Sequence, residues 1–319
     1  MGDHVKLNEV DKVEILMLQD NYVELTAMDH SAVVQRAMPL DGGEIRRSVQ
    51  AEHGFSAFVT TTKNGAAGTV LLDFGFSAGG VAFNARSLNV PMQNVDVLAL
   101  SHGHSDHFGG FAEAVKLIGK KGIELVVHPD VFKSPRYLKF SEEMKIYFPK
   151  ITREEIEHLG VRIVETSQPL PILGGDVLFL GKIERVSDFE KGFPIAHYEE
   201  GGTEKWDPIE DDTALAIHLK GKGLVIISGC AHAGIVNSVS FAKRITGVEK
   251  VHAIIGGFHL SGPLFEAIIG RTTEELKKIG PEYIVPCHCT GRKAIMAIEK
   301  EMPAQFILNM SGTKLTFSS

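Results

Sequence analysis

Disulfide bonds, a basic surface and a membrane anchor are all poorly supported by this sequence. Its three cysteines, Cys230, Cys287 and Cys289, are too few for a disulfide framework, and no Cys-x-x-Cys pair occurs. The net charge of -7 argues against nucleic acid as the main partner, because the positive footprint is missing. No positive segment followed by an apolar run begins the chain, so no secretory signal is expected.

The longest stretch without Asp, Glu, Lys or Arg, residues 223–242, has the length of a membrane span. It contains His232, Asn237 and several serines and glycines, which favour a buried strand, a loop and a helix instead. We therefore expect a soluble, cytoplasmic protein that does not enter a membrane. Sequence leaves the oligomeric state open, and a homo-oligomer is possible.

The composition is that of a globular protein, with 319 residues, 44% hydrophobic and 23% charged. Short β-branched apolar runs predict strands, at 13–18, 57–62, 69–73, 95–100, 123–128, 161–165, 177–180, 214–219, 224–228, 251–255 and 283–286, with a final hairpin of 305–308 and 314–317 around Ser311-Gly312-Thr313. Helical periodicity predicts helices at 110–119, 235–246, 264–279 and 293–301. The recurrent order of strand, polar loop and helix predicts an α/β fold with its chemistry at the loop ends.

Residues 129–212 differ from the rest and are expected to be an elaboration of a single 1–319 domain. The segment is rich in Lys, Glu, Tyr and Phe, with helix-like pieces at 142–148 and 153–159. Our hypothesis is that it shapes a substrate pocket; a solvated surface excursion is the alternative.

One cluster indicates metal chemistry. The run 95–100 ends in Ser101-His102-Gly103-His104-Ser105-Asp106-His107, which places four potential ligands within six residues. Imidazole nitrogen and carboxylate oxygen suit Zn, Mn or Fe. The alternative, a polar loop whose histidines cap the next helix, explains this density poorly.

A local cluster cannot complete two coordination shells, so distal ligands are required. Three other strand-like runs end in loops with suitable side chains, namely Cys230-Ala231-His232, Phe258-His259 and Cys287-His288-Cys289. His53, in Glu52-His53-Gly54, is a possible pocket residue.

These residues resemble the metallo-β-lactamase fold superfamily, whose signature is His-x-His-x-Asp-His at the end of a strand. Asp73-Phe74-Gly75 is similar to its upstream Asp-x-Gly element. Within the superfamily, further segments resemble the group named for 7,8-dihydropterin-6-methyl-4-(β-D-ribofuranosyl)aminobenzene 5'-phosphate synthase, namely 52–56, 228–237, 256–260 and 286–291. The likeness spans residues from about 13 to 317.

The resemblance implies a four-layer αββα sandwich with two divalent metal ions, Zn foremost, at one edge. The implied ligands are His102, His104 and His232 for one ion and Asp106, His107 and His288 for the other. Many superfamily members have a bridging aspartate where this chain has Cys230. The bridge and the occupancy of the second site therefore stay open.

The function implied is hydrolysis or group transfer on a small molecule bearing phosphate or pyrophosphate, as in methanopterin biosynthesis. Asp106, Cys230 and His259 are the expected catalytic residues, with His259 donating a proton or a hydrogen bond to the leaving group. His53, Lys182 and Arg185 are candidate substrate-binding residues, with Arg136 a weaker one. The alternatives are a di-iron redox protein, which would partner a flavin domain that is not apparent here, and a metal-binding protein without turnover.

Overall fold

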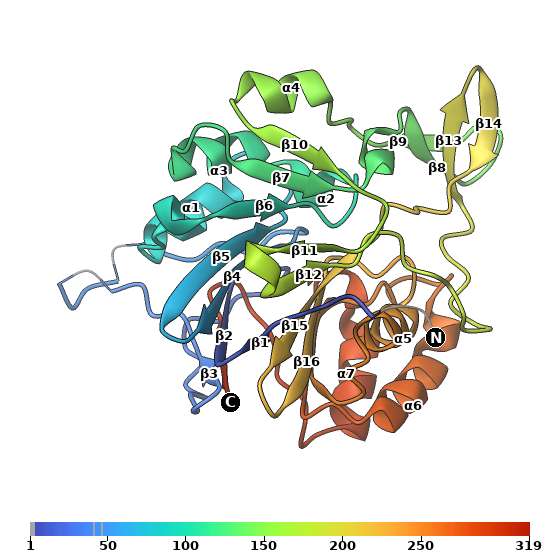
Figure 1. Cartoon of the computed structure of the whole chain (residues 1–319). Helices are drawn as coiled ribbons and strands as arrows, with labels where there is room; N and C mark the ends of the chain where they lie inside the picture. Colours follow the sequence, from blue (N-terminus) through green and yellow to red (C-terminus); the bar gives the residue numbers. More distant parts are fainter. Residues whose placement is uncertain (1–3, 41, 46) are drawn as a thin grey trace.

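Two large sheets pack face to face at the centre of the computed structural model, which describes residues 4–40, 42–45 and 47–319 (Figure 1). The first sheet has the order β10-β7-β6-β5-β4-β2-β19-β3. Its strands are β2 (Lys12–Gln19), β3 (Val34–Gln35), β4 (Ser56–Lys63), β5 (Ala66–Leu72), β6 (Val97–Ala99), β7 (Glu124–Val127), β10 (Arg162–Glu165) and β19 (Lys314–Ser318).

The second sheet has the order β11-β12-β15-β16-β17-β18, and a seventh strand, β1, pairs with β15. Its strands are β1 (Glu9–Val10), β11 (Leu170–Ile172), β12 (Val177–Phe179), β15 (Ala214–Leu219), β16 (Gly223–Ser228), β17 (Val251–Gly257) and β18 (Tyr283–Cys287). Pairing is parallel among β5, β6 and β7 and among β16, β17 and β18. The carboxyl ends of these strands meet at one edge of the sandwich.

Successive side chains along each strand point to opposite faces of its sheet, and the buried ones form three apolar layers: one between the sheets and one beneath the helices on each outer face. In β16, Val225 and Ile227 face the space between the sheets, where they join Ile15 of β2 in one buried cluster. Leu224 and Ile226 point to the opposite face and pack under the C-terminal helices. A strand buried on both faces reads as a continuous apolar run, which is why 224–228 lacks polar alternation.

Helices cover both outer faces, α1 and α3 over the first sheet and α5, α6 and α7 over the second (Figure 1). The helices are α1 (Gly80–Ser87), α2 (Ser105–Phe108), α3 (Phe111–Ile118), α4 (Arg153–His158), α5 (Ile235–Thr246), α6 (Ile269–Ile279) and α7 (Arg292–Glu301). Short 3-10 turns lie at Met92–Asn94, Pro129–Phe132, Leu173–Gly175, Glu266–Ile268 and His288–Thr290. The expected α/β fold, a four-layer αββα sandwich, is confirmed. Within the described chain, no helix is long and apolar enough to cross a membrane.

The stretch 129–212 is not one separate block. Its strand β10 completes the first sheet, and β11 and β12 belong to the second. A smaller sheet of order β14-β13-β8-β9 stands apart beside them (Figure 1). Its strands are β8 (Arg136–Lys139), β9 (Lys145–Tyr147), β13 (Ala196–Glu200) and β14 (Thr203–Trp206).

Two local predictions are wrong. Residues 142–148 contain strand β9 instead of a helix, because Lys145–Tyr147 pairs with β8 in the small sheet. Residues 305–308 form no hairpin with β19, which pairs with β2 and β3 instead. Phe306 makes only an isolated bridge to Ile284. In the first case a short hairpin with the neighbouring strand β8 forms in place of the helix, and in the second β19 pairs with strands that are distant in the sequence.

Candidate metal centre

The first ligand group consists of His102, His104 and His232. Their nearest ligand atoms all lie within 4.8 Å of one another, and all three side chains are buried. His102 and His104 come from the loop after β6, with 3.1 Å between His102 Nε2 and His104 Nδ1. Gly103 between them packs against Val131, where a Cβ would lie 2.6 Å from the Val131 carbonyl oxygen. His232 follows β16 in the facing sheet. Its two ring nitrogens are buried without a hydrogen-bond partner among the described residues, as expected for a side chain that awaits a ligand.

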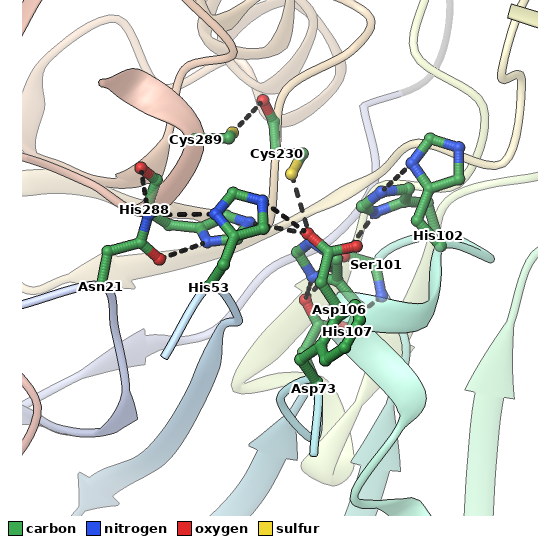
Figure 2. A network of polar contacts seen from close by, with 12 residues as sticks. Asn21, His53, Asp73, Ser101, His102, Asp106, His107, Cys230, His288 and Cys289 are labelled. Atoms are coloured by element: carbon green, nitrogen blue, oxygen red, sulfur yellow. Dashed lines mark hydrogen bonds and ion pairs between the residues drawn. The ribbon is translucent and has the colours of Figure 1, made fainter. Parts of the chain in front are cut away.

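The second ligand group consists of Asp106, His107, Cys230 and His288, again within 4.8 Å of one another. His107 Nε2 lies 3.1 Å from Cys230 Sγ, and His288 Nε2 lies 3.3 Å from Asp106 Oδ2. Figure 2 shows these side chains converging, Asp106 and His107 from α2, Cys230 from the segment after β16 and His288 from the 3-10 turn after β18. The two groups are adjacent, since the ring centroids of His102 and His107 are 4.2 Å apart.

The chemistry of both groups fits metal ions. Three imidazoles form the first set, and a carboxylate, two imidazoles and a thiol form the second; both are typical of zinc and related cations. Burial lowers the pKa of His102, and burial together with Arg136 lowers the pKa of His104 to about 3, so both rings are in the neutral form that binds metal. The pKa of Asp106 is held low despite burial, because His107 and His288 favour its carboxylate.

His107 is oriented by Asp73, which follows β5. Asp73 Oδ2 lies 2.6 Å from His107 Nδ1 and also accepts from Ser101 Oγ at 2.7 Å, while Oδ1 accepts from Ser101 N at 2.7 Å. Burial opposes protonation of His107, but Asp106 and Asp73 outweigh it and raise its pKa to about 9. The ring is therefore protonated in the metal-free protein, and because Asp73 holds the proton on Nδ1, it is Nε2 that must lose its proton for a metal to bind in the second group. This is the buttressing role that the Asp-x-Gly resemblance implies.

A second buried network supports the loop that carries His102 and His104, and sequence reasoning missed most of this network. Asp211 Oδ2 accepts from Gly103 N at 2.8 Å and pairs with Arg136 Nη1 at 2.9 Å. Arg136 Nε also contacts Asp207 at 2.8 Å. Arg136, considered above for phosphate binding, is thus engaged with two carboxylates. The sequence feature that could have indicated this network is the acidic pair Asp211-Asp212, which lies just before strand β15.

Asp212 supports the loop that carries His232. Its Oδ2 accepts from Ala233 N at 2.9 Å, and burial raises its pKa to about 7. Asp212 Oδ1 is buried without a hydrogen-bond partner in the described part of the chain. The side chain therefore fixes the turn between β16 and α5 and leaves one oxygen unused.

Two cavities open beside the ligand groups. One of ≈ 370 Å³ is lined by His232, Lys191 and Trp206, and one of ≈ 560 Å³ by His53, Phe193 and His288, each among other residues. His259, Leu264 and Phe265 line both. Most of the remaining lining is apolar. The small sheet and the segment after β12 contribute several of these side chains, among them Leu138, Phe140, Phe193 and Trp206.

The predicted substrate residues fall in different places. His53 lies at the site, with Nε2 3.5 Å from Asp106 Oδ2. Arg185 donates to the carbonyl of Pro208, and its buried Nε lacks a partner among the described residues. Lys182 pairs with Glu210 and lines a separate cavity. The structure therefore brings His53, but not Lys182, to the candidate ligand groups.

Sequence and structure comparisons give consistent relatives. A sequence model described as the metallo-beta-lactamase superfamily matches residues 52–198. The chain is 37% identical to a 7,8-dihydropterin-6-methyl-4-(beta-D-ribofuranosyl)-aminobenzene-5'-phosphate synthase of Methanocaldococcus jannaschii, over 83% of this chain and 90% of that protein. It is 29% identical to an uncharacterized protein of the same organism, MJ0448, over 78% of this chain and 88% of the relative.

Among solved structures, the chain is similar to Tm1679, described as a metal-dependent hydrolase of the beta-lactamase superfamily. The TM-score is 0.73 at 24% identity, and the match covers 96% of this chain and 100% of the other. At this identity the likeness shows a shared fold.

Proposed function

Because this chain belongs to the metallo-beta-lactamase superfamily, we propose that its two ligand groups bind two divalent cations, zinc foremost, and that it is a metal-dependent enzyme. The substrate is a small molecule bearing phosphate or pyrophosphate. The reaction is the joining of a dihydropterin methylene carbon to the amine of an aminobenzene ribofuranoside phosphate, with pyrophosphate as the leaving group; the Methanocaldococcus jannaschii relative is named as the synthase of such a conjugate. The observation that carries the proposal is the pair of adjacent ligand groups beside two apolar cavities.

Two cavities suit a reaction of two substrates. Volumes of ≈ 370 and ≈ 560 Å³ are each within the range of small-molecule sites. They share His259, Leu264 and Phe265, so molecules held in both would meet at those side chains. A hydrolase needs only one such cavity and water. Apolar walls that exclude water favour transfer over hydrolysis.

The aromatic lining suits flat rings. Phe193 and Phe265 have centroids 5.1 Å apart in an edge-to-face arrangement, and Trp206 lines the smaller cavity. Faces of this kind hold heteroaromatic and aminobenzene rings by stacking. Lys191 lines the same cavity and offers an ammonium group to a phosphate.

Bound divalent cations would supply Lewis acidity toward phosphate oxygens. The protein's own groups would then position the reactants. His259 reaches both cavities and is placed to hydrogen-bond to the departing phosphate. His53 lies 3.5 Å from Asp106 and lines the larger cavity, where it would contact a bound substrate.

The test offers the metal-loaded protein a dihydropterin methyl pyrophosphate together with an aminobenzene ribofuranoside 5'-phosphate. We expect one pyrophosphate released for each condensed product, measured by mass spectrometry, and no reaction in chelator-treated protein. Phosphomonoester and phosphodiester substrates serve as comparators. Turnover of those esters without condensation would contradict the transferase assignment.

A further inference from the structure

We propose that Cys230, His259 and Cys289 form a third metal site, for a thiophilic divalent cation such as Zn²⁺. Their ligand atoms lie within 4.8 Å of one another. The three residues follow the carboxyl ends of β16, β17 and β18, three strands that are adjacent in the second sheet. This group is separate from the first ligand group and shares only Cys230 with the second.

The backbone is shaped to bring the Cys289 side chain against Cys230. Cys289 Sγ lies 3.4 Å from the carbonyl oxygen of Cys230, and Figure 2 shows the two cysteines side by side. A side chain at Gly257 would place its Cβ 2.6 Å from Cys289 Sγ and 3.2 Å from Cys230 Cα. Only glycine leaves the sulfur this room.

His259 completes the set from a strained position. Its φ of 44° is in the left-handed region, which non-glycine residues seldom adopt and which is common at functional sites. Its Nδ1 is buried and has no hydrogen-bond partner in the described residues. The ring is packed against His232, with centroids 4.1 Å apart. An unpaired buried nitrogen beside two thiols is satisfied by a cation that all three can bind.

The donor types select the metal. Two thiolates and one imidazole form a soft set that prefers zinc over magnesium or calcium. Cys230 would then be shared by the second and third groups, whereas the aspartate at this sequence position in the resemblance described above joins the first and second ions. His259 and Cys289 line the larger cavity, which gives the ion a path of entry.

Cys287 provides a matched control. It lies two residues before Cys289 and is equally buried, yet it packs in the apolar cluster between the sheets. It belongs to none of the candidate ligand groups among the described residues. Cys287→Ala therefore removes a buried thiol without touching a proposed ligand.

The experiment titrates metal-free, reduced protein with an NMR-active cadmium isotope under anaerobic conditions. We expect three equivalents bound per chain, one for each ligand group, and three cadmium resonances that shift further downfield as the number of thiolates rises. Cys289→Ala should lose the third equivalent and its most downfield resonance and keep the other two. Cys287→Ala should keep all three.

His259→Ala tests the same site from another loop and covers the case in which Cys289→Ala fails to fold. It should weaken the third equivalent at least tenfold and leave the first two unchanged. Two equivalents in the wild type, or a third that persists in Cys289→Ala, would overturn the proposal. Either of these results, together with intact condensation activity, would overturn the third site and leave the proposed function standing. Three bound equivalents without turnover on any phosphate substrate would instead contradict the proposed function.

Discussion

Replacing Asp73 by Asn should weaken metal binding at the second ligand group and leave the first almost unchanged. Asp73 is fully buried, and its Oδ2 lies 2.6 Å from His107 Nδ1. Removing a carboxylate that orients a metal-binding histidine typically costs ~10–100-fold in affinity, which corresponds to about 1.4–2.8 kcal/mol. We expect a loss in that range for one of the cations.

The reason is the tautomer of His107. Asp73 Oδ1 accepts from Ser101 N, so an asparagine must keep its carbonyl oxygen there. Its amide nitrogen then faces His107 Nδ1 and donates to it, which moves the ring proton to Nε2. A protonated Nε2 cannot bind metal. Asn also tolerates the backbone, because φ at Asp73 is 58° and Asn, like Asp, is among the non-glycine residues that adopt this region most often.

The assay is competition between the protein and a chelator of known affinity, with the two cations resolved by titration. Asp96→Asn is the matched control, because Asp96 Oδ2 also accepts a backbone bond, from Thr69 N at 3.0 Å, but lies away from the metal ligands. Equal affinities in wild type and Asp73→Asn would refute the orienting role. Equal losses at both cations would show a general disturbance instead.

Three further predictions concern activity, pH and folding. Asp106→Ala should abolish turnover, because the Asp106 carboxylate contacts other candidate site residues. The circular dichroism spectrum of this variant should match that of the wild type. Burial raises the pKa of Glu190 to about 7 from its ordinary 4.5, so the folded state binds this proton more tightly than the unfolded state. Its contribution to stability is therefore greatest below pH 4.5 and falls by up to about 3 kcal/mol as pH rises to 7, a slope that urea denaturation of Glu190→Gln should lack. Arg136→Met leaves Asp207 and Asp211 buried without their partner and should lower the unfolding free energy by about 3–5 kcal/mol.

Controls for these predictions lie on the surface. Glu274→Gln, an exposed change on α6, should keep the pH slope of the wild type. Arg153→Met removes a half-exposed pair with Glu165 and should cost less than about 1 kcal/mol. Undiminished activity in Asp106→Ala, or equal destabilisation by the two arginine changes, would contradict the roles assigned to Asp106 and Arg136.

Apolar runs and helical periodicity predicted most strands and helices of the two main sheets, and the resemblance to the superfamily implied their arrangement as a sandwich. Residues 235–246, for example, were predicted as a helix with the bounds of α5. The small sheet escaped prediction. Its strands are short and polar, and β8 pairs with both β9 and the distant β13, a relation that no local pattern reveals.

The candidate site also contains some residues that the sequence predicts and others that it does not. His102, His104, Asp106 and His107 lie within six residues, so the sequence alone predicts that they act together. Assigning His232 to the first group depended on the resemblance, and the structure brings its ring to within 4.8 Å of His102. The pairing of Arg136 with Asp211 joins residues far apart in the chain, which is why a buried supporting arginine was considered for phosphate binding.

The most direct test of the central claim is pyrophosphate release measured against bound metal. Metal-free protein is reloaded stepwise with Zn²⁺ in the presence of both proposed substrates, and pyrophosphate and condensed product are followed together. We expect no release without metal and release that rises in proportion to product once both ligand groups are filled. Equal turnover by the chelated protein, or none by the fully loaded protein, would contradict the account.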